Sequence, residues 1–213
     1  MINQYFSEFL ALASIHLLAV MAPGPDFAIT VSQSVRNGRK AGVYIALGIG
    51  VGMSVHIIYT VFGVGALMYS SPVLMNFARV VGGGYIFYLS CNLLKAKKFS
   101  ASDADASDKR DVAQSWSRLF WTGFLTNATN PKATLFFLAV FTTVVSVNTP
   151  IYVQIGYGAW MCFVNTLWFV LVANLFTHQG VRKRFLRMGH WFERLMGVLL
   201  MLFAIRLMWD IFS

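Results

Sequence analysis

Long apolar segments separated by short polar stretches make up most of this 213-residue chain. Six runs with few charged residues cover roughly residues 5–35, 41–69, 72–94, 119–147, 151–177 and 195–212. A membrane-spanning helix needs about 20 predominantly apolar residues, so each run is long enough, or nearly so, to cross a bilayer. The pattern therefore predicts an all-α membrane protein with six transmembrane helices, embedded in a lipid bilayer.

Two of the expected helices, the first and the fourth, contain proline motifs near their middle. The residues expected to break them are Pro23, Gly24, Pro25 and Pro131. Proline lacks a backbone donor and crowds the preceding turn, so a helix does not continue through it undisturbed. Within a bilayer, broken backbone is tolerated only where it is buried in protein or lines a polar cavity. The two breaks are therefore the first candidates for a functional site.

The basic residues predict the topology. Fourteen of the 17 fall in three clusters between apolar runs: Arg36, Arg39, Lys40; Lys95, Lys97, Lys98, Lys109, Arg110, Arg118; and Arg182, Lys183, Arg184, Arg187, Arg194. The positive-inside rule assigns such clusters to the cytoplasm. Both termini then face outward. The chain divides into a first half (1–94), a cytoplasmic linker (95–118) and a second half (119–213), which form one membrane domain.

The halves are expected to be inverted repeats, because each crosses the membrane three times and opens with a broken helix. Paired broken helices in inverted halves are typical of transporters whose binding site lies near the bilayer midplane. The second apolar run also carries Gly48 and Gly52, whose spacing favours close packing between helices. Such glycine faces leave a homodimer open.

Asp26 and Lys132 each follow the proline of a break directly, so they occupy matched positions. At 1.5 Å per residue, both lie roughly 15–20 Å from the cytoplasmic edge. Ionisable groups at that depth mark functional sites by default. One anion and one cation suit an amino-acid zwitterion, with Asn127 and Asn130 adding hydrogen bonds and a half-helix N-terminus assisting the carboxylate.

Asp26 is also the one carboxylate deep in an expected span, which makes it the candidate for proton coupling. The alternative is structural: Asp26 and Lys132 neutralise each other, or Asp26 caps its own half-helix. Arg79 and Arg206 are open to a substrate role or to local pairing. His16 and His56 are either members of a proton relay or packing histidines, and Asn165 is expected to form an interhelical hydrogen bond.

Composition narrows the function class. The hydrophobic fraction is 57% and the charged fraction 12%, far from the roughly quarter of charged residues in soluble domains. The basic excess is explained by topology, so no nucleic-acid partner is expected. The sequence has no zinc-protease, nucleophile-elbow or phosphate-loop motif. Neither an enzyme nor a cofactor or metal site is expected, and Cys91 and Cys162 are interpreted as core thiols.

Three stretches resemble the LysE/RhtB superfamily of amino-acid exporters: Met-Ala-Pro-Gly-Pro-Asp-Phe at 21–27, Gly-Arg-Lys-Ala-Gly at 38–42, and Gly-Phe-Leu-Thr-Asn-Ala-Thr-Asn-Pro-Lys-Ala at 123–133. The Pro-Gly-Pro-Asp form, with Val-Gly-Gly-Gly-Tyr at 81–85, is similar to the homoserine/threonine branch (RhtB and RhtC type). The resemblance implies a multi-pass protein of the bacterial inner membrane that exports small neutral amino acids, threonine-like or homoserine-like, by proton antiport.

Other functions stay open on sequence alone. One is export of a different substrate, such as a basic or sulfur-containing amino acid, a metabolite or a metal cation. A metal would need more carboxylate, thiol or imidazole ligands at one depth than Asp26 supplies. Another is a membrane protein that does not transport at all.

Overall fold

A computed structural model describes residues 2–70, 72–96, 115–146 and 148–212. All the secondary structure in these ranges is α-helical, as expected for a membrane protein of this pattern. The helices are α1 (Ile2–Met21), α2 (Pro25–Asn37), α3 (Arg39–Ser70), α4 (Pro72–Leu94), α6 (Trp116–Ala128), α7 (Pro131–Thr143), α8 (Ile151–Phe176) and α9 (Gln179–Phe212).

Five of the described helices contain a segment long and apolar enough to cross a bilayer. These segments are Asn3–Met21, Arg39–Gly63, Asn76–Leu94, Ile151–Phe176 and Met188–Arg206. The fourth expected span corresponds to α6 followed by α7, two helices of 13 residues each. Neither could cross alone, since about 20 residues are needed. The all-helical membrane class is thus confirmed, while the count of six crossings stays a prediction.

Both proline motifs end one helix and begin another. Helix α1 stops at Met21 and α2 starts at Pro25, and α6 stops at Ala128 before α7 starts at Pro131. In both cases proline takes the first helical position, where its missing N–H has no helical partner to lose and its fixed φ suits the turn. The same residue type thus ends the earlier helix and begins the next.

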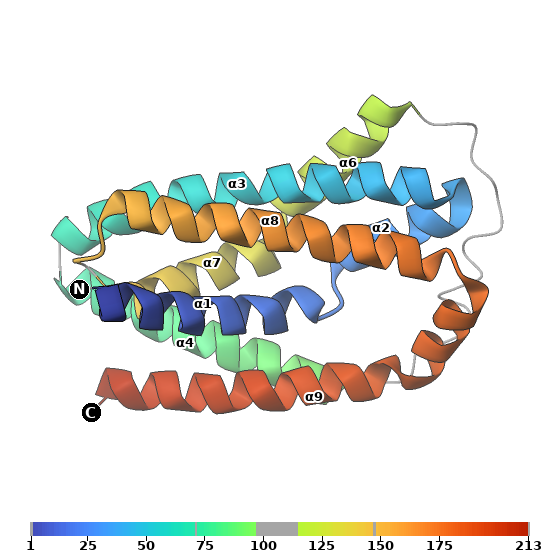
Figure 1. Ribbon diagram of the computed structural model, residues 1–213. Helices are drawn as coiled ribbons and strands as arrows, with labels where there is room; N and C mark the ends of the chain where they lie inside the picture. The colour runs from blue at the N-terminus through green and yellow to red at the C-terminus, as the bar shows by residue number, and fades with distance from the viewer. Residues whose placement is uncertain (1, 71, 97–114, 147, 213) are drawn as a thin grey trace.

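Helix α3 packs against α2, α6, α7 and α8, and α4 packs against α7 and α9. Figure 1 shows α3 running beside α8 along the length of the bundle. The contact between α3 and α6 depends on glycine. A Cβ at Gly48 would meet the backbone of Phe120, and one at Gly123 would meet the carbonyl of Ile45. The expected packing role of Gly48 is therefore confirmed, with α6 as its partner.

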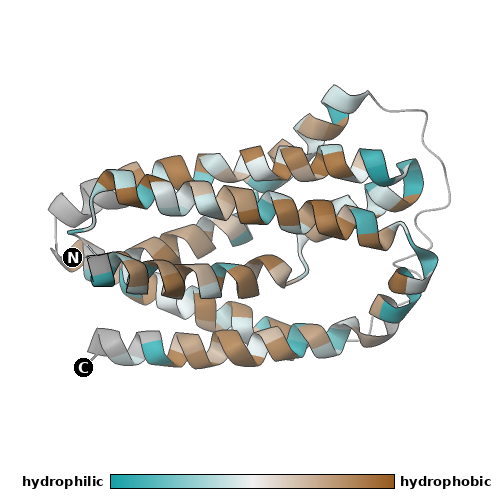
Figure 2. Cartoon of the chain, viewed as in Figure 1, coloured by the Kyte–Doolittle hydropathy of each residue, from teal (hydrophilic) through white to brown (hydrophobic). Residues whose placement is uncertain are grey.

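The two ends of the bundle differ in polarity. Both chain termini lie at one end, and the α2–α3 and α8–α9 connections lie at the other (Figure 1). Hydrophilic residues gather at the latter end, whereas hydrophobic residues prevail along the lengths of the long helices (Figure 2). The basic cluster at the α2–α3 connection and the start of the basic cluster in α9, just after the α8–α9 connection, therefore share one end, as the alternation of loops predicts.

Two expected boundaries differ from the structure. Helix α9 begins at Gln179, so the basic stretch 182–194 is helical rather than a loop before a span at residue 195. Arginine and lysine are good helix formers, and their long stems let a charged segment continue an apolar helix. Helix α6 likewise begins at Trp116, inside the expected linker 95–118, whose residues 97–114 lie outside the described ranges.

Candidate functional site

Asp26 lies in the first turn of α2 and is held by the second break. Its Oδ2 accepts hydrogen bonds from Asn127 Nδ2 at 2.9 Å and from Asn130 Nδ2 at 3.2 Å. Asn127 lies in the last turn of α6, and Asn130 is the residue that precedes α7. Two residues about a hundred positions away thus fix the carboxylate of the first break.

Lys132 lies in the first turn of α7 and reaches back to the first break. Its Nζ donates to the carbonyl oxygen of Ala22 at 3.0 Å, just past the end of α1. Its backbone N–H donates to Asn130 Oδ1 at 3.0 Å, so Asn130 caps α7. A cation is favourable at the C-terminal end of a helix. The hydrogen bonds of Asp26 and Lys132 therefore go to different partners, although the two breaks lie side by side.

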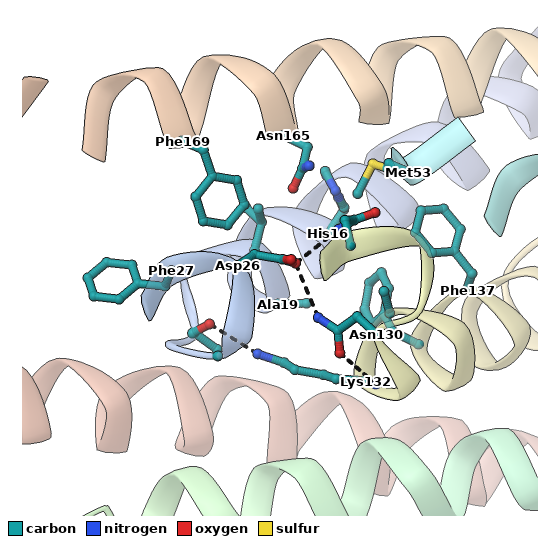
Figure 3. A pocket seen from close by; sticks show the side chains of 16 residues that line it. His16, Ala19, Asp26, Phe27, Met53, Asn130, Lys132, Phe137, Asn165 and Phe169 are labelled. Carbon is teal, nitrogen blue, oxygen red and sulfur yellow. Dashed lines mark hydrogen bonds between the residues drawn. The ribbon is translucent and has the colours of Figure 1, made fainter. Parts of the chain in front are cut away.

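A cavity of about 50 Å³ lies between the two breaks (Figure 3). Its polar lining comes from α1, α2, α6, α8 and the start of α7, and its apolar wall includes Met53, Phe136, Phe137 and Phe169. The polar side chains are His16, Asp26, Asn127, Asn130, Lys132 and Asn165. One water molecule needs roughly 10–15 Å³ of such a volume, so this cavity has room for a few water molecules.

Several polar atoms of this lining have no hydrogen-bond partner among the described residues. They are Asp26 Oδ1, Asn127 Oδ1, Asn165 Nδ2 and both ring nitrogens of His16. A buried polar group without a partner costs about 1–3 kcal/mol. Several such groups around one cavity are what a site for a polar ligand requires, because the ligand supplies the missing partners.

His56, the other candidate for a proton relay, has a contact at each of its two ring nitrogens. Its Nε2 lies 2.8 Å from the carbonyl oxygen of Asn127, and its Nδ1 lies 2.8 Å from the hydroxyl of Tyr59. It does not line the cavity. His56 thus bonds the residue that holds Asp26, and the choice between a packing role and a relay role stays a prediction.

Arg79 is not brought to the cavity. Its Nε donates to the carbonyl oxygen of Thr142 at 3.0 Å, in the last turn of α7. Arg206 lines a separate cavity nearer the chain termini. Of the sequence-predicted residues, the structure brings Asp26, Asn127, Asn130 and Lys132 together and leaves the two arginines elsewhere.

The sequence did not predict the placement of three residues at or near the site. His16 was expected to join a proton relay or to pack, and Asn165 to bond between helices, but both line the cavity with atoms that have no partner among the described residues. Glu193 lies in the membrane-length segment Met188–Arg206 of α9 and interacts electrostatically with Lys132, a partner that the sequence did not indicate. The sequence signal for Glu193 was hidden because its basic neighbours made the stretch look like a loop.

Comparison with known proteins bears on the whole chain. A family model described as LysE type translocator matches residues 17–210. The threonine efflux proteins of Salmonella typhi and Escherichia coli strain K12 are 31% and 30% identical over 199 residues, which cover 93% of this chain and 96% of each relative.

A more distant relative has no assigned function. The uncharacterized membrane protein YahN of Escherichia coli strain K12 is 25% identical over 189 residues, 88% of this chain and 83% of the relative. No solved structure matches the chain. The family model and the efflux relatives cover both helix breaks and nearly every helix, so the chain belongs to the LysE type translocator family.

Proposed function

We propose that this protein exports small neutral amino acids, threonine-like or homoserine-like, across the bacterial inner membrane in exchange for protons. The observation that carries the proposal is the cavity between the two breaks, where a carboxylate and an ammonium group lie with unpartnered polar atoms. Relatives of similar length named as threonine efflux proteins support the substrate class.

The cavity suits the two charged groups that all free amino acids share. Asp26 Oδ1 and Asn127 Oδ1 are acceptors without partners in the described structure, and they would receive the substrate ammonium. Lys132 Nζ would bind the carboxylate. Gly24 precedes α2 without a side-chain cap, and a Cβ there would lie 3.5 Å from Lys132 Nζ. The carboxylate would thus also meet the positive N-terminal end of α2.

Competition at Asp26 would supply the coupling. One buried carboxylate oxygen accepts either a proton or the substrate ammonium, and binding of one disfavours the other because both neutralise the same charge. A carrier that releases substrate on one side and takes up a proton there would then return loaded with the proton. That is the exchange an antiporter performs.

Two further cavities, one on each side of the site, would serve alternating access. A cavity of about 380 Å³ between α2, α8 and α9 shares Phe27 with the site, toward the end with the basic connections. Another of about 550 Å³ lies between α1, α7 and α9, toward the termini. Six crossings in two inverted halves, with both termini periplasmic, would let the halves rock about the breaks and open each cavity in turn.

Uptake into inside-out membrane vesicles tests the proposal directly. Labelled threonine, homoserine, leucine, cysteine and lysine are offered with and without an imposed pH gradient. Gradient-dependent accumulation of threonine or homoserine, lost in Asp26→Asn, is the expected result. Accumulation of lysine alone, or of threonine without any dependence on the gradient, would contradict the substrate class or the coupling respectively.

A further inference from the structure

We infer that His16 and Asn165 form a subsite that recognises a hydroxyl group on the side chain of the transported amino acid. The inference rests on the proposed function and makes it narrower. Asp26 and Lys132 would bind the ammonium and carboxylate groups that all free amino acids share. Discrimination between amino acids must therefore come from the other residues that line the cavity.

The two residues lie in the part of the cavity supplied by other helices. His16 comes from α1 and Asn165 from α8. Asp26, Lys132 and the two asparagines beside them come from the starts of α2 and α7 and the end of α6. His16 is 1% exposed and Asn165 is 2% exposed. Figure 3 shows the Asn165 side chain pointing from its helix into the pocket.

Packing alone does not account for His16. The centroid of its ring lies 6.3 Å from that of Phe136 and 5.9 Å from that of Trp160. These contacts hold the ring in place, yet neither nitrogen has a hydrogen-bond partner among the described residues. By contrast, both ring nitrogens of His56 have partners. A buried imidazole is normally satisfied, so the missing partners of His16 point to a ligand.

A hydroxyl group matches the two free functions. A neutral imidazole has one acceptor nitrogen, and Asn165 Nδ2 is a donor. The substrate hydroxyl would donate to His16 and accept from Asn165. An apolar side chain of the same shape would leave both groups unpartnered, and sites built to bind a hydroxyl strongly reject analogues that lack it.

The size and charge of the cavity limit the side chain further. Asp26 is the one carboxylate among the described residues that line it, so a second cationic group on the substrate would find no partner. The small volume, about 50 Å³ before any opening, favours short chains. Serine, threonine and homoserine have short side chains with a hydroxyl group and no second positive charge. Valine replaces the threonine hydroxyl with a methyl group, so it lacks the group that His16 and Asn165 would bind.

The test compares threonine with valine in inside-out vesicles. Each unlabelled amino acid competes against labelled threonine, for wild type, His16→Phe and Asn165→Leu. Wild type is expected to favour threonine by at least tenfold, and each variant to lower that ratio roughly tenfold, which is about one hydrogen bond. His16→Gln, which keeps a hydrogen-bonding group, is expected to recover part of the preference.

Asn174→Leu is the matched control, since Asn174 lies on the same helix but donates to the carbonyl oxygen of Val170. It is expected to keep the wild-type ratio. An unchanged ratio in both cavity variants overturns the inference and leaves the proposed function standing. Failure of wild type to transport any amino acid overturns the proposed function and, with it, the inference.

A second measurement covers variants that fail to fold. Purified wild-type protein in detergent is heated with L-threonine or L-valine at equal concentration, since a ligand that binds the folded state raises the unfolding temperature. Stabilisation by threonine well above that by valine supports the hydroxyl subsite. Equal stabilisation by both contradicts it.

Discussion

The two helix breaks begin alike with a proline, but they satisfy their backbone in different ways. At the second break two residues separate the helices, and Asn130 caps α7 by accepting from the backbone of Lys132. At the first break three residues separate the helices, and Gly24 gives α2 no side-chain cap. The second break thus supplies the cap of its own helix, whereas the first is bound by side chains of the second.

The packing of the flanking helices differs less, because helices on both sides of the comparison lie close to α3: a Cβ at Gly42 of α3 would meet Ser34 of α2, the helix that follows the first break. Helix α6, which leads to the second break, lies against α3 so closely that Gly48 and Gly123 leave no space for side chains. At the first break the carboxylate and the end of α1 are in addition held by Asn127, Asn130 and Lys132. The comparison indicates that the first break depends on side chains of the second, whereas the second supplies the cap of its own helix.

The largest effect is expected at the first break, from Asp26→Asn. The change removes the negative charge while keeping the size of the side chain, so the substrate ammonium loses its counter-charge. Gradient-driven threonine uptake should fall roughly 100-fold, in line with about 3 kcal/mol for removing one partner of a buried charge pair. Uptake in vesicles measures the fall, and threonine exchange without a gradient separates lost coupling from lost binding. Normal gradient-driven uptake by Asp26→Asn would contradict the assignment of Asp26 to the site.

Lys132→Gln is expected to act on both breaks with a smaller effect. The variant keeps a hydrogen-bond donor for the carbonyl of Ala22 but loses the charge that faces the substrate carboxylate. Affinity for threonine should fall roughly tenfold to thirtyfold, as for a hydrogen bond to a charged group. Competition uptake measures it, with Lys40→Gln as control because Lys40 is exposed at the start of α3. An equal loss in both variants would argue for a general charge effect.

Gly123→Val tests whether the second break is fixed by α3. The new side chain would meet the carbonyl of Ile45, so α6 must move away or α3 must bend. Overpacking of this kind destabilises a protein by about 1–3 kcal/mol. Thermal unfolding in detergent should shift down, and Gly156→Val serves as control because a Cβ there meets nothing within 4 Å. Equal unfolding temperatures would contradict a close backbone contact between α6 and α3.

The smallest effect separates the capped break from the uncapped one. Asn130→Ala removes the cap of α7 and a hydrogen bond to Asp26, and loss of such a cap costs about 1 kcal/mol. Gly24→Ala removes no cap, its φ of −168° suits any residue, and the nearest atom lies at 3.5 Å. Its unfolding temperature should therefore stay close to wild type while that of Asn130→Ala falls. The reverse order would contradict the division between the two breaks.

Sequence patterns predicted the helical class, the apolar segments and the places where two helices stop. They succeeded because proline acts locally: it ends a helix whatever surrounds it. The same reasoning placed Asp26 and Lys132 at matched depths. It failed at Glu193 and at the start of α9, because basic residues within an apolar helix look like a loop when only their charge is considered.

Tertiary structure alone decided the partners. Hydrogen bonds from Asn127 and Asn130 to Asp26 span about a hundred residues, and no local spacing specifies them. The contact between Lys132 and Ala22 involves a backbone carbonyl, which every residue carries and no sequence pattern distinguishes. His16 and Asn165 look the same in sequence as His56 and Asn174. Only the packing of α1 and α8 around the cavity leaves both ring nitrogens of His16 and the Nδ2 of Asn165 without partners in the part of the chain that the structure describes. Local chemistry therefore determined where the helices break, and long-range packing determined which groups at the breaks remain free to bind.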